Sequence, residues 1–203
     1  MYEAKKFKSI HELDGISERT MTEHYKLYEG YVKKYNEITE KLKTVDLESA
    51  NQTYSEIRSL KIDLTFAIGG VRNHELYFGH LGLPRAESRG GNGGEPSGEL
   101  AKMVIRDFGS YGAWRQDFTA TAMAARGWAW LAWDRELKKL FNFIGDTQNT
   151  YPVWDCAPLV ALDVYEHAYY LDFGIKRADY IEAFFKNLDW LVVEDHFVRL
   201  GVK

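Results

Sequence analysis

The chain has 203 residues, of which 45% are hydrophobic and 15% aromatic, and this composition predicts a globular protein with a sizeable core. Its formal net charge of −4 at pH 7 is mild and gives no indication of nucleic acid as a partner. One cysteine, no apolar stretch long enough to span a membrane and a polar N-terminus together predict a cytoplasmic protein with no intrachain disulfide and no membrane partner.

The first part of the chain is predicted to form two helices. Ser17, or alternatively Thr20, can cap the first helix, in which apolar and aromatic residues then recur every three or four positions. The second helix is expected over roughly Leu47–Leu81, with the pair Gly69 and Gly70 inside it. Paired glycines inside a helix indicate close packing or a site that needs room.

A glycine-rich linker at residues 90–98 separates an N-terminal domain, residues 1–89, from a C-terminal domain, residues 99–203. The hydrophobic pattern of the second domain predicts two helices, a hairpin, a further strand and a final helical region. These elements are expected at Glu99–Phe108, Tyr111–Ala125, Trp128–Trp133, Leu140–Ile144, Pro158–Asp163 and about Ala168–Val193. The sequence therefore predicts an α+β fold, in which an N-terminal helical hairpin packs on a C-terminal α+β domain with a small antiparallel sheet.

Asp163 and His167 stand four residues apart, directly after a predicted buried strand. This pair is either half of a metal site or a core histidine with a structural carboxylate. His24 and His74 lie on the two N-terminal helices, and each alone is more typical of a core histidine than of a ligand. Convergence of the four would give three imidazoles and one carboxylate, a set that suits a first-row transition metal.

The remaining histidines are expected at the surface, because they lie near element ends in polar surroundings. They are His11, His80 and His196.

Several segments, taken in order along the chain, resemble those of the iron/manganese superoxide dismutases. The segments are Gly69–His74, Phe108–Ser110, Gly127–Leu131, Asp163–Tyr170 and Lys176–Ile181 with the tail to Trp190. The resemblance implies an enzyme that disproportionates superoxide to oxygen and hydrogen peroxide by cycling one Mn or Fe ion between 3+ and 2+. It also implies that His24, His74, Asp163 and His167 are the metal ligands.

The resemblance further implies a glutamine next to the metal, here Gln148, and its place after the hairpin favours manganese, with iron or use of either metal open. A gateway tyrosine is usual eight residues after the first ligand. Here Val32 holds that position, so Tyr31 is assigned the role and Tyr28 a place in the substrate channel. The pocket walls implied are Tyr28, Phe78, Trp128 and Tyr165.

The resemblance also implies a homodimer, or else a tetramer, in which Glu166 bonds His167 of the other subunit and Tyr170 reaches the other channel. Two alternatives from other classes remain open. One is a metal-dependent oxygenase or peroxidase-like enzyme on the same scaffold, and the other is a non-catalytic metal-binding relative.

Overall fold

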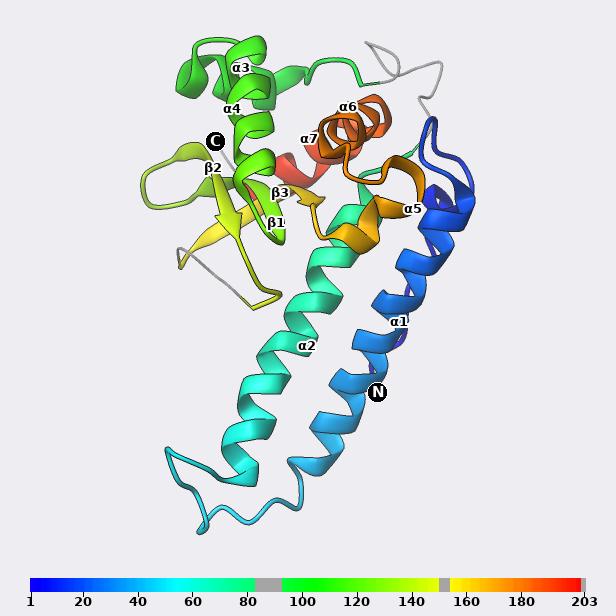
Figure 1. The fold of residues 1–203 in the computed structure, drawn as a ribbon. Coiled ribbons are helices and arrows are strands. Elements are labelled where there is room, and N and C mark those ends of the chain that lie inside the picture. The colour runs from blue at the N-terminus through cyan, green and yellow to red at the C-terminus, as the bar shows by residue number, and fades with distance from the viewer. Residues whose placement is uncertain (83–92, 150–153, 202–203) are drawn as a thin grey trace.

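Two long antiparallel helices, α1 (Glu18–Lys41) and α2 (Glu56–Gly79), form the N-terminal half of this computed structural model, which describes residues 1–82, 93–149 and 154–201. They lie side by side and extend away from the rest of the molecule (Figure 1). A short 3-10 helix, η1 (Lys8–Ile10), precedes them. The Ser17 hydroxyl accepts a hydrogen bond from the backbone N–H of Thr20, so the predicted cap of α1 is confirmed.

The second helix begins later than the sequence predicts, at Glu56 and not near Leu47. The Asn51 side chain accepts hydrogen bonds from the backbone N–H groups of Thr53 and Tyr54, and Ser55 caps α2. These local side-chain bonds offer the backbone an alternative to the helix, and they hold residues 47–55 outside it.

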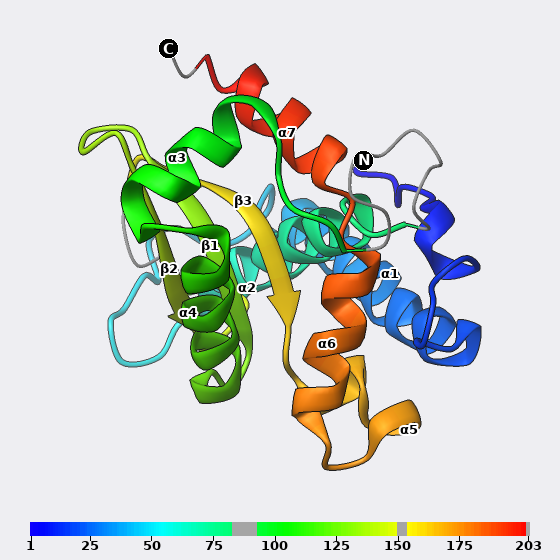
Figure 2. The same cartoon turned by 90° about the horizontal axis from the view of Figure 1, so that it is seen from above.

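The C-terminal half combines helices with a three-stranded antiparallel sheet of order β2-β1-β3. Its first elements are α3 (Gly98–Phe108), α4 (Tyr111–Ala124), β1 (Trp128–Asp134), β2 (Lys139–Gly145) and β3 (Cys156–Asp163). All seven residues of β1 are buried, as expected for a central strand. Helices α3 and α4 contact the β1–β2 side of the sheet, whereas α2 and α7 contact β3 (Figure 2).

Strand β3 is an edge strand, and its pairing with β1 shifts register between Leu131 and Ala132. Leu131 pairs with Val160 and Ala132 with Pro158, so Leu159 is the extra residue of a bulge. Proline has no N–H for the ladder and is tolerated at edges and bulges, which explains its place here. The strand then continues in register to Asp163, opposite Trp128.

The region predicted as one final helix is divided into several. The 3-10 helix η2 (Glu166–Ala168) and α5 (Tyr170–Phe173) come first, and α6 (Arg177–Asn187) and α7 (Trp190–Arg199) follow. Gly174 ends α5 with a φ of +54°, a conformation that glycine adopts without strain. Asp189 caps α7, so a new helix starts where the periodic pattern alone suggested continuation.

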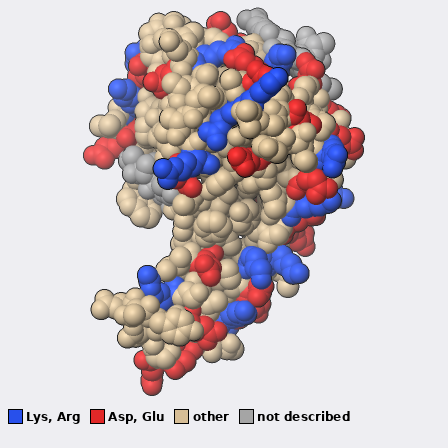
Figure 3. All heavy atoms as spheres, viewed as in Figure 1, with Lys and Arg blue, Asp and Glu red and all other residues tan. Residues whose placement is uncertain are grey.

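One hydrophobic core joins the two halves, running from α1 and α2 into the sheet and the C-terminal helices. On the face of the molecule seen in Figure 3, acidic and basic side chains are interspersed. No helix among residues 1–82, 93–149 and 154–201 is both long and apolar enough to cross a membrane. Part of the predicted linker, residues 90–92, lies outside the described residues, and its remainder leads into α3 at Gly98.

Candidate metal centre

Four side chains from both halves of the chain converge on one point. His24 comes from α1, His74 from α2, Asp163 from the end of β3 and His167 from η2, and one ligand atom of each lies within 4.8 Å of the others. The Nε2 atoms of His24, His167 and His74 are 3.1, 3.2 and 3.6 Å from Oδ2 of Asp163. The structure therefore brings together all four residues of the predicted ligand set.

Close packing of the two long helices places His24 and His74 side by side, with ring centroids 5.0 Å apart. The packing depends on Gly70, because a Cβ at this position would lie 2.6 Å from Cγ of Tyr31. Gly70 also contributes its carbonyl oxygen, which is 2.7 Å from Nδ1 of His74. Gly70, the second glycine of the pair, thus provides the close approach that the sequence indicated.

Hydrogen bonding and burial fix the protonation of the cluster. The Gly70 carbonyl can only accept, so His74 carries its proton on Nδ1 and directs the Nε2 lone pair toward Asp163. Burial lowers the pKa of His74 to about 3 and also lowers that of His24. Burial alone would raise the pKa of Asp163, but His167 and His24 outweigh it and hold this pKa well below its ordinary value.

His167 is the one member of the set whose side chain reaches the surface, with 30% of it exposed. Burial lowers its pKa, but the neighbouring Asp163 carboxylate more than compensates, and the net shift is upward. Metal ligands must be deprotonated, so a cation that binds here requires His167 in its neutral form.

The cluster fits a single metal ion in both geometry and chemistry. Ligand atoms about 2.0–2.2 Å from a shared ion, at angles of 90–120°, lie roughly 2.8–3.8 Å from one another. The three Nε2–Oδ2 distances, 3.1, 3.2 and 3.6 Å, lie within that interval. In addition, Nε2 of His74 is buried and has no hydrogen-bond partner among the described residues. Neutral imidazoles with one carboxylate suit a divalent or trivalent first-row ion.

Gln148 lies beside the cluster, fully buried in the loop after β2. Its Oε1 accepts hydrogen bonds from Nε1 of Trp128 at 3.2 Å and from Nδ2 of Asn73 at 3.4 Å. The Asn73 amide also donates to the Gln148 carbonyl at 3.2 Å. Two donors on Oε1 orient the amide, leaving Nε2 to donate elsewhere. Asn73 belongs to the Gly69–His74 segment, but its contact with Gln148 depends on how the loop after β2 lies against α2, which the sequence pattern does not reveal.

Tyr31 is the tyrosine of α1 that reaches this environment. Its ring centroid is 5.4 Å from that of His74, and its hydroxyl bonds the Gln148 side chain. Seven residues are almost two full helical turns, so Tyr31 shares a face with His24, whereas Val32 turns into the core. Burial and the Asp163 charge raise the pKa of Tyr31, and the hydrogen bond from Gln148 partly opposes them.

Aromatic rings surround the cluster. The ring centroid of Phe78 lies 5.1 Å from that of His24, and the centroid of Trp128 lies 5.3 Å from that of His74, both edge-on. The Tyr165 ring stacks on the His167 ring, with centroids 5.4 Å apart. The Tyr165 hydroxyl donates to the carbonyl oxygen of Asp146.

Tyr28 lies further out than these rings. It packs on Phe78 at 6.2 Å, and its hydroxyl accepts from the Lys5 N–H and donates to Glu75. The channel role predicted for Tyr28 stays a prediction.

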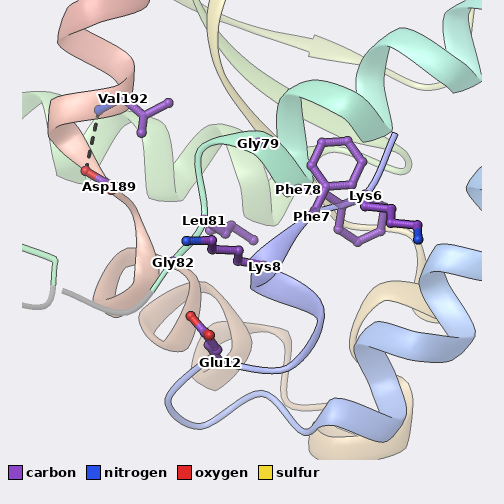
Figure 4. A pocket seen from close by; sticks show the side chains of 10 residues that line it. All are labelled: Lys6, Phe7, Lys8, Glu12, Phe78, Gly79, Leu81, Gly82, Asp189 and Val192. Carbon is purple, nitrogen blue, oxygen red and sulfur yellow. Dashed lines mark hydrogen bonds between the residues drawn. The ribbon is translucent and has the colours of Figure 1, made fainter. Parts of the chain in front are cut away.

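Phe78 also borders a pocket of about 480 Å³ (Figure 4). Phe7 packs on Phe78 there, with ring centroids 5.5 Å apart, and Lys6, Lys8 and Glu12 lie around the opening. None of the four clustered residues lines this pocket, so Phe78 separates it from the candidate metal centre.

Two predicted residues of η2 and α5 face outward. Glu166 is exposed, and so is Tyr170, with 52% of its surface accessible. Leu171 and Ile175, 53% and 89% exposed, continue this apolar surface along the chain.

His80 was predicted at the surface, and this was wrong. It is 1% exposed, and its Nε2 lies 3.0 Å from the backbone nitrogen of Ala161, which must be the donor. The helix pattern could not reveal this contact, because it depends on where edge strand β3 lies against the end of α2. Sequence reasoning likewise missed Tyr77 and Tyr180, two buried tyrosines near Asp163 that the apolar periodicity does not distinguish from ordinary core residues.

Comparison with known proteins identifies the family. Residues 12–82 match the model for the alpha-hairpin domain of iron/manganese superoxide dismutases, and residues 96–196 match the model for the C-terminal domain. An iron superoxide dismutase of Aquifex pyrophilus is 45% identical over 191 residues, covering 92% of this chain and 86% of that protein. A manganese superoxide dismutase of Haloarcula marismortui is 38% identical over 180 residues, covering 86% of this chain and 82% of that protein. The chain belongs to the iron/manganese superoxide dismutase family.

Proposed function

We propose that this protein is a superoxide dismutase, which converts two superoxide ions and two protons into oxygen and hydrogen peroxide. The observation that carries the proposal is the convergence of His24, His74, Asp163 and His167 within 4.8 Å of one another. These four residues are the proposed ligands. A Mn or Fe ion held by them would supply the one-electron redox chemistry that the reaction needs.

Gln148 and Tyr31 are proposed to manage protons beside the ion. Trp128 and Asn73 hold Oε1 of Gln148, which leaves its amide N–H free to donate to the Tyr31 hydroxyl. The raised pKa of Tyr31 keeps its phenol protonated at neutral pH, so the side chain has a proton to share. Hydrogen bonds of this kind next to a metal are also the protein's means of tuning its reduction potential.

Manganese is the proposed metal, on the support of Gln148, which enters the site from the loop after β2. Iron is the second candidate, because the relatives from Aquifex pyrophilus and Aquifex aeolicus, 45% and 44% identical, are both named as iron enzymes. The donor set suits either ion.

A homodimer is proposed to form across the surface of η2 and α5, with Glu166 bonding His167 of the other subunit. The outward position of Glu166 and the exposed Tyr170, Leu171 and Ile175 support this surface as the contact. The mass of the holoenzyme in solution, by light scattering after gel filtration, distinguishes monomer, dimer and tetramer. We also propose a cytoplasmic location, supported by a single, unpaired cysteine, Cys156.

The decisive experiment is pulse radiolysis of superoxide decay, per bound metal ion, on matched samples loaded with manganese or iron. Fast turnover with manganese alone supports the whole proposal, and fast turnover with iron alone keeps the function but changes the metal. His74→Gln should abolish turnover and reduce metal content. The matched control is His11→Gln. It removes an exposed imidazole that pairs with Glu18 and not with a residue of the cluster. Negligible turnover of both correctly loaded forms would refute the function and favour the oxygenase or non-catalytic alternative.

A further inference from the structure

The end of β3 carries Asp163 along an open sheet edge, where backbone groups that face away from β1 need other partners. Side chains of two helices supply them. The Ala161 N–H donates to Nε2 of His80 at 3.0 Å, and the Asp163 carbonyl accepts from the Tyr180 hydroxyl at 2.8 Å. His80 follows α2 and Tyr180 lies on α6, so both halves of the molecule hold this strand end.

The Tyr180 hydroxyl is itself held by a second phenol. Tyr77 of α2 lies 3.0 Å away, oxygen to oxygen, and both side chains are fully buried. A carbonyl cannot donate, so the single proton of Tyr180 points to Asp163, and Tyr77 must donate to Tyr180. The result is a directed chain from Tyr77 through Tyr180 to the main chain of Asp163. The Tyr77 ring also lies 5.0 Å from the ring of His24.

This chain completes the immobilisation of the peptide group between Asp163 and Val164. Its carbonyl accepts from Tyr180, and its N–H donates to the Gly127 carbonyl at 2.8 Å. The Asp163 side chain is fixed as well, because Oδ1 accepts from the Tyr165 N–H at 2.9 Å. With backbone and Oδ1 both held, only one orientation remains for Oδ2, the atom that faces the three histidines.

We propose that Tyr77 and Tyr180 are positioning residues for Asp163, and that their hydroxyl chain sets how firmly and at what potential the protein holds its metal. The inference rests on the proposed function only where turnover is read. Removing a side chain that hydrogen-bonds a metal ligand typically lowers metal affinity or activity 10–100-fold. Tyr180 acts through a backbone carbonyl, so the effect belongs near the lower end of this range.

The test compares three Tyr→Phe variants of the metal-loaded protein. Tyr180→Phe removes the bond to Asp163, and Tyr77→Phe removes only the support behind it. Tyr169→Phe is the matched control. The buried Tyr169 ring stacks on that of Tyr180, with centroids 5.1 Å apart, but its hydroxyl accepts a hydrogen bond from Nε of Arg177 and takes no part in the Tyr77–Tyr180 hydroxyl chain. Each variant is assayed for the rate of metal loss to a chelator, the reduction potential of the bound ion and turnover.

Tyr180→Phe should lose metal about ten-fold faster than the wild type and shift the reduction potential. Tyr77→Phe should change both in the same direction by less, and Tyr169→Phe should match the wild type. Equal metal loss and potential in Tyr180→Phe and Tyr169→Phe would overturn the inference. If Tyr180→Phe does not fold, Tyr77→Phe decides by the same comparison. Metal loss needs no superoxide, so a wild type without turnover would refute the proposed function while leaving this test intact.

Discussion

His80 should make the protein less stable in mild acid, and one substitution can isolate its contribution. The residue is buried, accepts the Ala161 N–H through Nε2 and must be neutral to do so. Burial, with a smaller contribution from the charge of His196 on α7, lowers its pKa from 6.5 to about 3. His80→Gln places a side-chain oxygen where Nε2 was, so the bond to Ala161 can persist without a titrating group.

The sign follows from proton uptake. The unfolded chain binds a proton at His80 as the pH falls below 6.5, whereas the folded protein does not until about pH 3. The stabilising contribution is therefore complete above pH 6.5 and is lost progressively as the pH falls toward 3. At pH 5 these two pKa values correspond to a loss of about 2 kcal/mol in the free energy of unfolding.

Urea unfolding at pH 8 and pH 5 checks this value. Between these two pH values, His80→Gln should lose about 2 kcal/mol less stability than the wild type, because all other titrating groups are shared and cancel. His80→Phe should have the same shallow pH dependence. It should also be less stable at both pH values by about 1–3 kcal/mol, because the Ala161 N–H loses its acceptor. Parallel curves for His80→Gln and the wild type would show that His80 does not titrate as argued.

Three further outcomes are expected. Gly70→Ala should cost about 1–3 kcal/mol of stability by urea unfolding, since its methyl group would lie 2.6 Å from the Tyr31 ring. The control Gly30→Ala, whose Cβ meets nothing within 4 Å, should be neutral or stabilising by up to about 1 kcal/mol, and equal losses in both would contradict the packing argument. Chelation should lower the melting temperature and added Mn or Fe restore it, because the ion binds only the folded chain; an unchanged melting temperature would argue against binding at the cluster. Asp163→Asn removes the only carboxylate of the cluster, and its metal content after dialysis should fall at least about ten-fold; wild-type content would exclude Asp163 as a ligand.

The sequence was sufficient for features that depend on local chemistry. The cap at Ser17 and the alternation of helix and strand could be read from residue types alone, and α2 deviates only where Asn51 and Ser55 bond their own backbone. The types of the four clustered residues indicated a possible ligand set, and only the family resemblance implied that they converge on a metal. Spacing by itself left His24 and His74 open as ordinary core histidines.

What the sequence could not provide was contact between distant elements. His80 and Ala161 are 81 residues apart, and Tyr77 and Tyr180 are 103 apart. Periodicity describes one helix at a time, so it cannot say which strand end a helix will face. The position of Tyr31 is an intermediate case, because helix geometry places it near His24 but only the packing at Gly70 places it beside His74.

The division of the cluster between the two halves sets an order in time during synthesis. His24 and His74 emerge early, but Asp163 follows His24 by 139 residues. At about 5–20 residues per second, a ribosome needs on the order of ten seconds for that interval. A nascent chain that has exposed only its first half therefore contains two of the four clustered residues. The complete set becomes available only after β3 and η2 have been synthesised, so the four-residue cluster is a product of the second half docking on the first.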